Sequence, residues 1–156
     1  MLAIGNNFGV PAEAFRQLGG FSPMYYRLAA EDRDFCSHWR ASGRSIIYAP
    51  DMVVLHAHAL TLVSFIRQHF HYGRGAWMYH RVLAQRYRRP QRIEPFRFYL
   101  SLLLWPLKVN QGMRPFLLMA LFLVSQAAQT AGYFRGFLAE LNEGTSPGEK
   151  RVTHVT

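Results

Sequence analysis

The chain has 156 residues, a formal net charge of +9 and one cysteine, and half of its residues are hydrophobic. This length allows one modest domain with a useful core, and the hydrophobic content excludes a disordered chain. Because Cys36 stands alone, an internal disulfide and a cysteine-rich zinc site are excluded, and we interpret it as a small core residue.

The excess positive charge lies in one block. Residues 1–60 carry five arginines against five acidic residues, whereas residues 61–114 carry nine arginines and one lysine against Glu94 alone. This block directly precedes the most apolar part of the chain, a pattern typical of the cytoplasmic side of a membrane. Nucleic acid is the rival partner for a chain of such high pI. Because the block is interleaved with large apolar residues and has no recognised reader motif, we expect a membrane partner and no nucleic acid.

Two short helices are expected in the first part of the chain. Residues 11–18 predict a helix that begins at a proline and ends at Gly19-Gly20. Residues 31–41 predict a second helix, because acidic residues fill its first turn and Gly43 stands at its C-terminal end.

The segments around these helices predict loops and strands. Residues 21–28 are expected to form a loop. Two short apolar runs, residues 45–49 and 52–56, predict two buried strands, and Pro50-Asp51 predicts the turn between them.

Residues 61–89 predict a long helix that only Gly73 and Gly75 interrupt. The helix is basic, amphipathic and rich in aromatic residues, which is typical of a helix that lies in the membrane interface. A surface helix of a soluble domain is the alternative interpretation.

Two apolar segments follow. Residues 98–107 are too few to cross a bilayer and predict an interfacial or re-entrant segment, whereas residues 115–134 contain no charge and have about the length needed to cross. If both are helical, they would form a hairpin. Polar residues in the second half of the longer segment predict contact with another helix rather than with lipid: Gln126, Gln129 and Thr130.

Several short motifs follow one another along residues 1–90. They are Gly5-Asn6-Asn7, Gly19-Gly20-Phe21, Glu31-Asp32, Tyr48-Ala49-Pro50, the histidine His56, and the run from Arg67 to Gly75. In this order and spacing they resemble the second half of the catalytic domain of family 2 glycosyltransferases, which are inverting enzymes with a nucleotide-sugar donor.

The resemblance implies an α/β fold, namely an incomplete GT-A (nucleotide-diphospho-sugar transferase-like) fold followed by amphipathic and transmembrane helices. The nucleotide-binding first half of that fold, with its own D-x-D metal motif, is expected to be missing, which makes a separate N-terminal half an expected partner. We therefore expect the C-terminal half of a catalytic domain at residues 1–60, a basic interface helix at 61–95, apolar membrane-associated helices at 96–136 and a disordered tail at 137–156.

The resemblance assigns the chemistry to the acidic pair that opens the second predicted helix. In the family the aspartate of this pair is the usual catalytic base, a role that falls here on Asp32. Glu31 would orient the loop or contact the acceptor, and Asp34 is either the fallback base or a solvated helix residue. Asn6 and Asn7 would bind substrate through amides that both donate and accept hydrogen bonds. Taken alone, these residues are ordinary helix capping and a simple turn.

His56 is the candidate metal ligand. In some members of this fold a histidine after the acidic helix completes the metal site, and His58 would lie on the same side of a strand. The implied cofactor is a divalent metal, Mg²⁺ or Mn²⁺, most of whose ligands are expected to be absent from this chain. A hydrogen-bonded surface histidine is the alternative.

Four residues of the long predicted helix complete the expected substrate site: Gln68, His71, Tyr72 and Arg74. Tyr72 would stack on a sugar ring, and Arg74 would supply positive charge at the departing diphosphate. Polymerising relatives carry Q-x-x-R-W here, so the His71 and Tyr72 of this chain argue against processivity. Ordinary arginines of an interfacial helix are the alternative.

The implied reaction is inverting transfer of a sugar from a nucleotide diphosphate-sugar to a hydroxyl acceptor. A lipid or a cell-envelope glycan fits the basic helix and the apolar C-terminal part, with the catalytic part on the cytoplasmic face of the membrane. The alternative is a non-catalytic membrane-associated partner or remnant. It predicts no affinity for nucleotide-sugars and no effect of the substitution Asp32→Asn.

Overall fold

The structure of the chain is a computed structural model that describes residues 7–55, 57, 59–88, 94–109 and 112–144. All of the elements in these ranges are helical. In chain order they are α1 (Ala12–Gln17), the 3₁₀-helix η1 (Pro23–Tyr25), α2 (Glu31–Ala41), α3 (Leu62–Tyr87), α4 (Phe96–Val109) and α5 (Arg114–Gly144).

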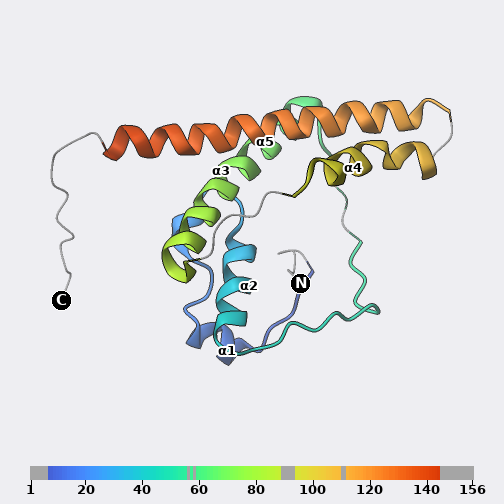
Figure 1. Cartoon of the computed structure of the whole chain (residues 1–156). Helices are drawn as coiled ribbons and strands as arrows, with labels where there is room; N and C mark the ends of the chain where they lie inside the picture. Colours follow the sequence, from blue (N-terminus) through green and yellow to red (C-terminus); the bar gives the residue numbers. More distant parts are fainter. Residues whose placement is uncertain (1–6, 56, 58, 89–93, 110–111, 145–156) are drawn as a thin grey trace.

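Helix α5 extends along one side of the molecule; α1, α2 and α4 lie below it in Figure 1, and α3 crosses it. Helix α4 runs beside the first half of α5 and packs against it, so the two form the hairpin expected for two apolar helices. Helix α3 crosses α5 near its middle and packs against it (Figure 1). Helices α2 and α1 follow at increasing distance from α5.

Glycines lie at the crossing of α3 and α5 and allow the two backbones to come into contact. A methyl group on Gly73 would lie 1.9 Å from the carbonyl oxygen of Gln129, and one on Gly132 would lie 2.0 Å from the carbonyl oxygen of Phe70. Both clashes are with backbone, so only glycine allows the two helices to approach this closely. Because α3 runs unbroken from Leu62 to Tyr87, the expectation that its glycines interrupt the helix is wrong.

The predicted α/β fold of the GT-A type is wrong, because no described residue belongs to a strand or sheet. The two predicted strands, residues 45–49 and 52–56, form extended loop as far as residue 55, and His56 lies outside the described residues. Ile47 is 86% exposed and Leu55 is 96% exposed. A strand needs a neighbour to pair its backbone groups and to cover its apolar face, and the described residues supply neither.

The predicted helices agree with the structure. Helix α1 covers most of residues 11–18, and Gly19 takes the left-handed φ of 79° that ends it. Helix α2 coincides with residues 31–41, and Gly43 follows with φ 82°. A short 3₁₀-helix, η1, lies within the segment expected to be loop.

Helix α5 contains the whole of residues 115–134 and continues to Gly144, into the range assigned to the tail; residues 145–156 lie outside the described residues. Within α5, the stretch Arg114–Asn142 is long and apolar enough to cross a membrane, with a mean hydropathy of 1.3. It is the one such helix found in the described parts of the chain, and 11% of its apolar window is buried within the protein.

The small core lies where η1, α2 and α3 meet. Tyr25, Ala30 and Tyr79 form its buried cluster, with Met78 packed against them. Cys36 is 3% exposed, which confirms its interpretation as a core residue.

Candidate functional site

The acidic pair Glu31 and Asp32 occupies the first two positions of α2, as the sequence predicts. The residue before the pair, Ala30, has a left-handed φ of 89°, which alanine rarely adopts, so the backbone is held there by its surroundings. Asp32 is half-buried, and its Oδ1 accepts a hydrogen bond from the backbone N–H of Arg33 at 2.7 Å. Glu31 is also half-buried, and its buried Oε2 has no hydrogen-bond partner among the described residues.

A close contact with α3 explains how that strained backbone is held. A methyl group on Gly75 would lie 2.0 Å from the carbonyl oxygen of Ala29, so the chain just before the acidic pair rests directly on the α3 backbone. One turn further along α3, Tyr79 packs on Ala30 and its hydroxyl lies 2.8 Å from Ser37 Oγ of α2. Helix α3 therefore fixes both the approach to α2 and its first half.

Gly73 and Gly75 give α3 two contact surfaces. Gly73 receives the backbone of α5 at Gln129, and Gly75 receives the backbone at Ala29. Residues two apart on a helix point to different sides, so α3 lies between the acidic pair and the long apolar helix. The sequence signal for this role is the Gly-Arg-Gly run, which we interpreted as a break in the helix.

The expected substrate residues of α3 lie on different parts of its surface. Gln68 Nε2 donates a hydrogen bond to the Tyr72 hydroxyl, and both side chains lie outside the core. His71 shares the face of Gly75, four residues on, and its buried Nδ1 has no hydrogen-bond partner in the described structure. Arg74 lies elsewhere, in a cavity of about 140 Å³ between α3 and α5.

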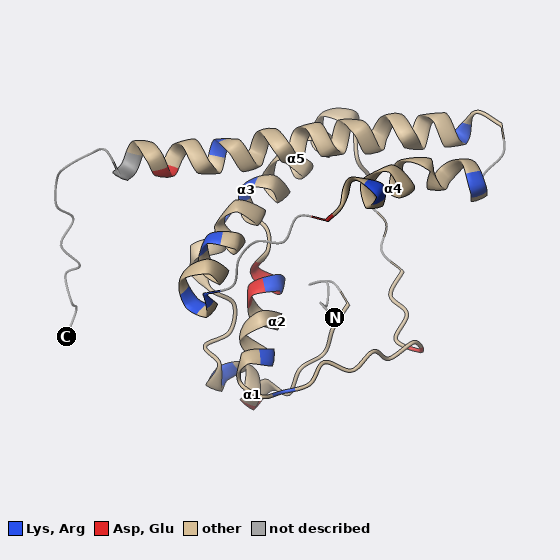
Figure 2. Cartoon of the chain, in the orientation of Figure 1, with Lys and Arg blue, Asp and Glu red and all other residues tan. Residues whose placement is uncertain are grey.

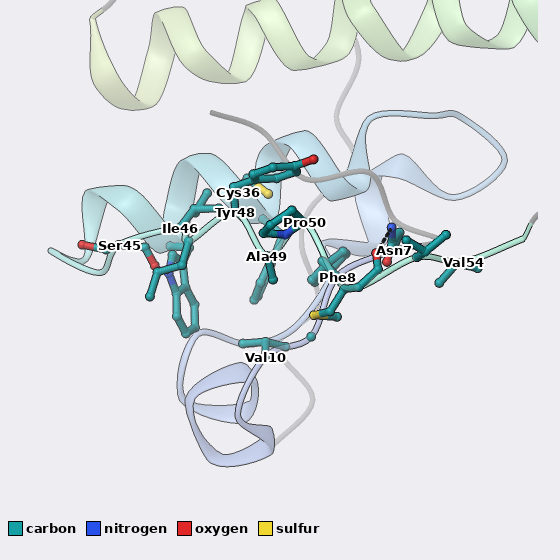
Figure 3. A pocket seen from close by; sticks show the side chains of 16 residues that line it. Asn7, Phe8, Val10, Cys36, Ser45, Ile46, Tyr48, Ala49, Pro50 and Val54 are labelled. Carbon is teal, nitrogen blue, oxygen red and sulfur yellow. Dashed lines mark hydrogen bonds between the residues drawn. The ribbon is translucent and has the colours of Figure 1, made fainter.

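A groove lies on the side of α2 that faces away from α3 (Figure 3). It has a volume of about 510 Å³ and is lined by residues 7–10, one face of α2 and the loop of residues 45–54 (Figure 3). Asn7 lies at its edge and donates a hydrogen bond from Nδ2 to the carbonyl oxygen of Met52 at 3.2 Å. Phe35, Cys36 and Trp39 are the α2 residues that line it, whereas Asp32 does not. The structure thus separates Asn7 and its groove from the acidic pair.

Asp34 belongs to a buried cluster that sequence patterns did not reveal. Its side chain is 6% exposed, and Oδ1 lies 3.4 Å from Nη1 of Arg86. Burial raises the pKa of this carboxyl above its ordinary value, although Arg86 and His38 act in the opposite direction. Burial, and then the Asp34 charge, also raise the pKa of the Tyr25 hydroxyl. This pairing makes Asp34 a structural partner of α3, not a solvated helix residue.

The expected metal site cannot be assembled from the described residues. His56 and His58 lie outside the described parts of the chain, as does Asn6. Within those parts, no three side chains of His, Cys, Asp or Glu gather as a metal ion requires. The described residues therefore do not supply a ligand set for a divalent cation.

Comparison with known proteins gives one match. The family model described as glycosyl transferase family group 2 matches residues 1–138, which include the acidic pair, all of α3 and most of α5. No curated protein and no solved structure matches the chain. Because the match covers most of the sequence, the chain belongs to glycosyl transferase family group 2.

Proposed function

We propose that the chain carries the acceptor side of an inverting glycosyltransferase, and that Asp32 is its catalytic base. The observation that carries the proposal is the position of Asp32 at the start of α2, on a strained backbone that rests on α3 through Ala29 and Gly75. Free N–H groups and the helix dipole at this end stabilise an ionised carboxylate. Family membership supplies the reaction class.

The proposed chemistry is a single displacement. The Asp32 carboxylate takes the proton from an acceptor hydroxyl while the acceptor oxygen forms a bond to the anomeric carbon of the donor sugar. The bond from that carbon to the nucleoside diphosphate breaks, and the diphosphate leaves with the electron pair. The configuration at the anomeric carbon is inverted because attack and departure occur on opposite faces.

Two buried polar atoms support a bound hydroxyl compound near the pair. Glu31 Oε2 and His71 Nδ1 both lack hydrogen-bond partners in the described part of the chain, and buried polar groups are normally satisfied. A sugar hydroxyl would satisfy either atom. Glu31 is thus proposed to bind the acceptor, and His71, with the neighbouring Gln68–Tyr72 pair, to line the sugar site.

The donor side is proposed to come from elsewhere. No three potential metal ligands lie together among the described residues, and Arg74 lines the cavity between α3 and α5. We propose that a nucleotide-sugar is bound jointly by this chain and by a further segment or polypeptide, with a divalent metal and His56 among its contacts. The exposed apolar side chains of Ile47 and Leu55 offer a surface on which such a part could pack. The acceptor is proposed to be a lipid or a cell-envelope glycan presented at the cytoplasmic face of a membrane.

Calorimetric titration tests this proposal. UDP- and GDP-sugars are titrated with Mn²⁺ into the detergent-solubilised chain, into His56→Ala, and into Asp51→Asn as a control in an exposed turn. Binding that Asp51→Asn retains and His56→Ala loses supports a donor site. A folded chain that binds none of these compounds would contradict joint binding of the donor and would place the whole donor site outside this chain.

A further inference from the structure

We propose that the α4–α5 hairpin lies flat in one membrane interface and does not cross the bilayer, although α5 is long and apolar enough to span. The partner of this surface is the headgroup and upper acyl region of one leaflet. The inference does not depend on the catalytic role of Asp32.

The crossing by α3 shortens the part of α5 that is free to enter lipid. From Gln129 onward, α5 is covered on one face by α3, through Gly73 and then through the contact of Gly136 with the Trp77 ring. The stretch that precedes this contact, from Arg114 to Ala128, packs against α4 and is about 22 Å long at ~1.5 Å per residue. The hydrocarbon core of a bilayer is about 30 Å thick, so this stretch is too short to cross it.

The charges of the crossing also oppose a spanning orientation. Arg81 Nε lies 3.2 Å from Oε1 of Glu140, and Arg74 lines the same cavity between α3 and α5. If the whole of α5 crossed the bilayer, α3 would be drawn into the hydrocarbon with these arginines. A charged residue near the bilayer centre is strongly unfavourable.

Charged residues also oppose a hairpin that enters the membrane and returns to the same side. Helix α4 has 14 residues, so it is about 21 Å long and also too short to cross. Lys108 stands in the last turn of α4 and Arg114 begins α5, which places basic residues at this end of the hairpin (Figure 2). A hairpin that dipped into the membrane would carry both charges to its deepest point.

An in-plane position satisfies all of these groups. On α5 the face opposite the α3 crossing carries exposed apolar side chains, which suit the acyl boundary: Phe116, Leu123, Phe134, Leu138 and Leu141. On α4 a stripe at helical spacing is likewise exposed: Phe98, Leu102, Trp105 and Val109. Lys108, Arg114 and the arginines of α3 would then lie at headgroup depth, where anionic lipids attract them.

Labelling with a membrane-impermeant maleimide tests the proposal. Met113→Cys reports the hairpin loop, Ser45→Cys reports the part of the chain that contains α2, and Leu123→Cys reports the outward face of α5, each in a Cys36→Ser background. These three residues are exposed. If Cys36→Ser does not fold, the native Cys36 is retained, because it is 3% exposed. Labelling is compared between right-side-out and inside-out vesicles, and solubilisation in SDS gives the total.

An in-plane hairpin predicts that Met113→Cys and Ser45→Cys react from the same side of the membrane and that Leu123→Cys reacts only after solubilisation. A spanning α5 predicts reaction of Met113→Cys from the side opposite Ser45→Cys, because α3 joins the part of the chain that contains α2 to the second half of α5. That result would overturn the proposal. Protection of Met113→Cys from both sides would overturn it in favour of a re-entrant hairpin, and free reaction of Leu123→Cys in vesicles would overturn membrane docking.

Discussion

The two sides of α3 are closely packed against other parts of the chain, whereas the loop of residues 45–55 is largely exposed. Along α3, Gly73 and Gly75 bring two other backbones into direct contact, and the pairing of Arg86 with Asp34 adds a third link. In the loop, apolar side chains such as Leu55 point into solvent, and the hydrogen bonds between backbone groups are local, such as that from the Met52 N–H to the Ala49 carbonyl oxygen. The comparison shows which part of the chain is held by packing against other helices and which part is largely exposed.

The largest expected effect comes from filling the α3–α5 contact. The substitution Gly132→Leu places a side chain where the Phe70 carbonyl oxygen lies 2.0 Å from the site of the first added carbon, so we expect a loss of about 3 kcal/mol in the free energy of unfolding. Unfolding in detergent micelles, followed by tryptophan fluorescence, measures it. Ala127→Leu on the exposed side of the same helix is the control, expected to change stability by less than ~0.5 kcal/mol. Equal stabilities would show that the helices do not pack at Gly132.

Gly75→Ala gives the next effect, and its sign is informative. Helix propensity alone favours alanine by ~1 kcal/mol, whereas the backbone of Ala29 leaves no room for the methyl group. We expect the clash to win, with a net loss of ~1–2 kcal/mol in the free energy of unfolding. Gly9→Ala, where nothing lies within 4 Å, is the neutral control. A stabilised Gly75→Ala would mean that α3 does not support the acidic pair.

The same variant has a local readout. With ¹³C-labelled aspartate, the carboxyl signal of Asp32 is expected to move in Gly75→Ala, because the backbone before α2 is displaced, while that of Asp51 stays fixed. Gly73→Ala is the matched control, since its clash lies on the α5 side. An Asp32 signal that responds equally to both glycines would point to general loosening.

Asp34 links stability to pH. Because burial raises its pKa above the ordinary value of 3.8, the folded state holds this proton more tightly than the unfolded state does. The contribution of the protonated Asp34 carboxyl to the free energy of unfolding is therefore complete below pH 3.8 and is lost as the pH rises through the folded-state pKa. As the pH rises from about 3.5 to 7, the wild type should therefore lose stability relative to Asp34→Asn. A wild type that gains stability relative to Asp34→Asn over this range would show that the folded-state pKa of Asp34 is lowered, not raised.

The smallest effect is expected in the loop. Leu55 is 96% exposed, so Leu55→Ser should change the free energy of unfolding by less than ~0.5 kcal/mol. The same chemical unfolding experiment measures it. A loss above ~1 kcal/mol would show that the loop is packed, and the contrast with α3 would fail.

Local patterns predicted the helices and failed where contacts are distant in sequence. Helices α1 and α2 are specified by their own first turns and by the glycines after them, so the sequence suffices. The strands at 45–49 and 52–56 failed because strand pairing is non-local and apolar composition alone does not supply a neighbour.

The candidate site shows the same limit. The position of Asp32 at a helix start follows from the local sequence. Of the polar residues predicted to face another helix, Gln129 does so, with its Nε2 3.3 Å from His69 Nδ1, whereas Thr130 is exposed. The contacts of Asp34 with Arg86 and of Gly75 with Ala29 could not be predicted, because the partners are 52 and about 46 residues apart. Glycines inside a helical pattern were the available signal, and close packing was the correct interpretation.

The most direct test of the account is the turnover of Asp32→Asn. Release of nucleoside diphosphate from UDP- and GDP-sugars by the solubilised chain, with any donor-binding partner restored, is compared with that of Asp51→Asn. The account predicts a fall in kcat of about 100-fold or more for Asp32→Asn, because the acceptor hydroxyl loses its base, and wild-type turnover for Asp51→Asn. Wild-type turnover in Asp32→Asn would contradict the central claim.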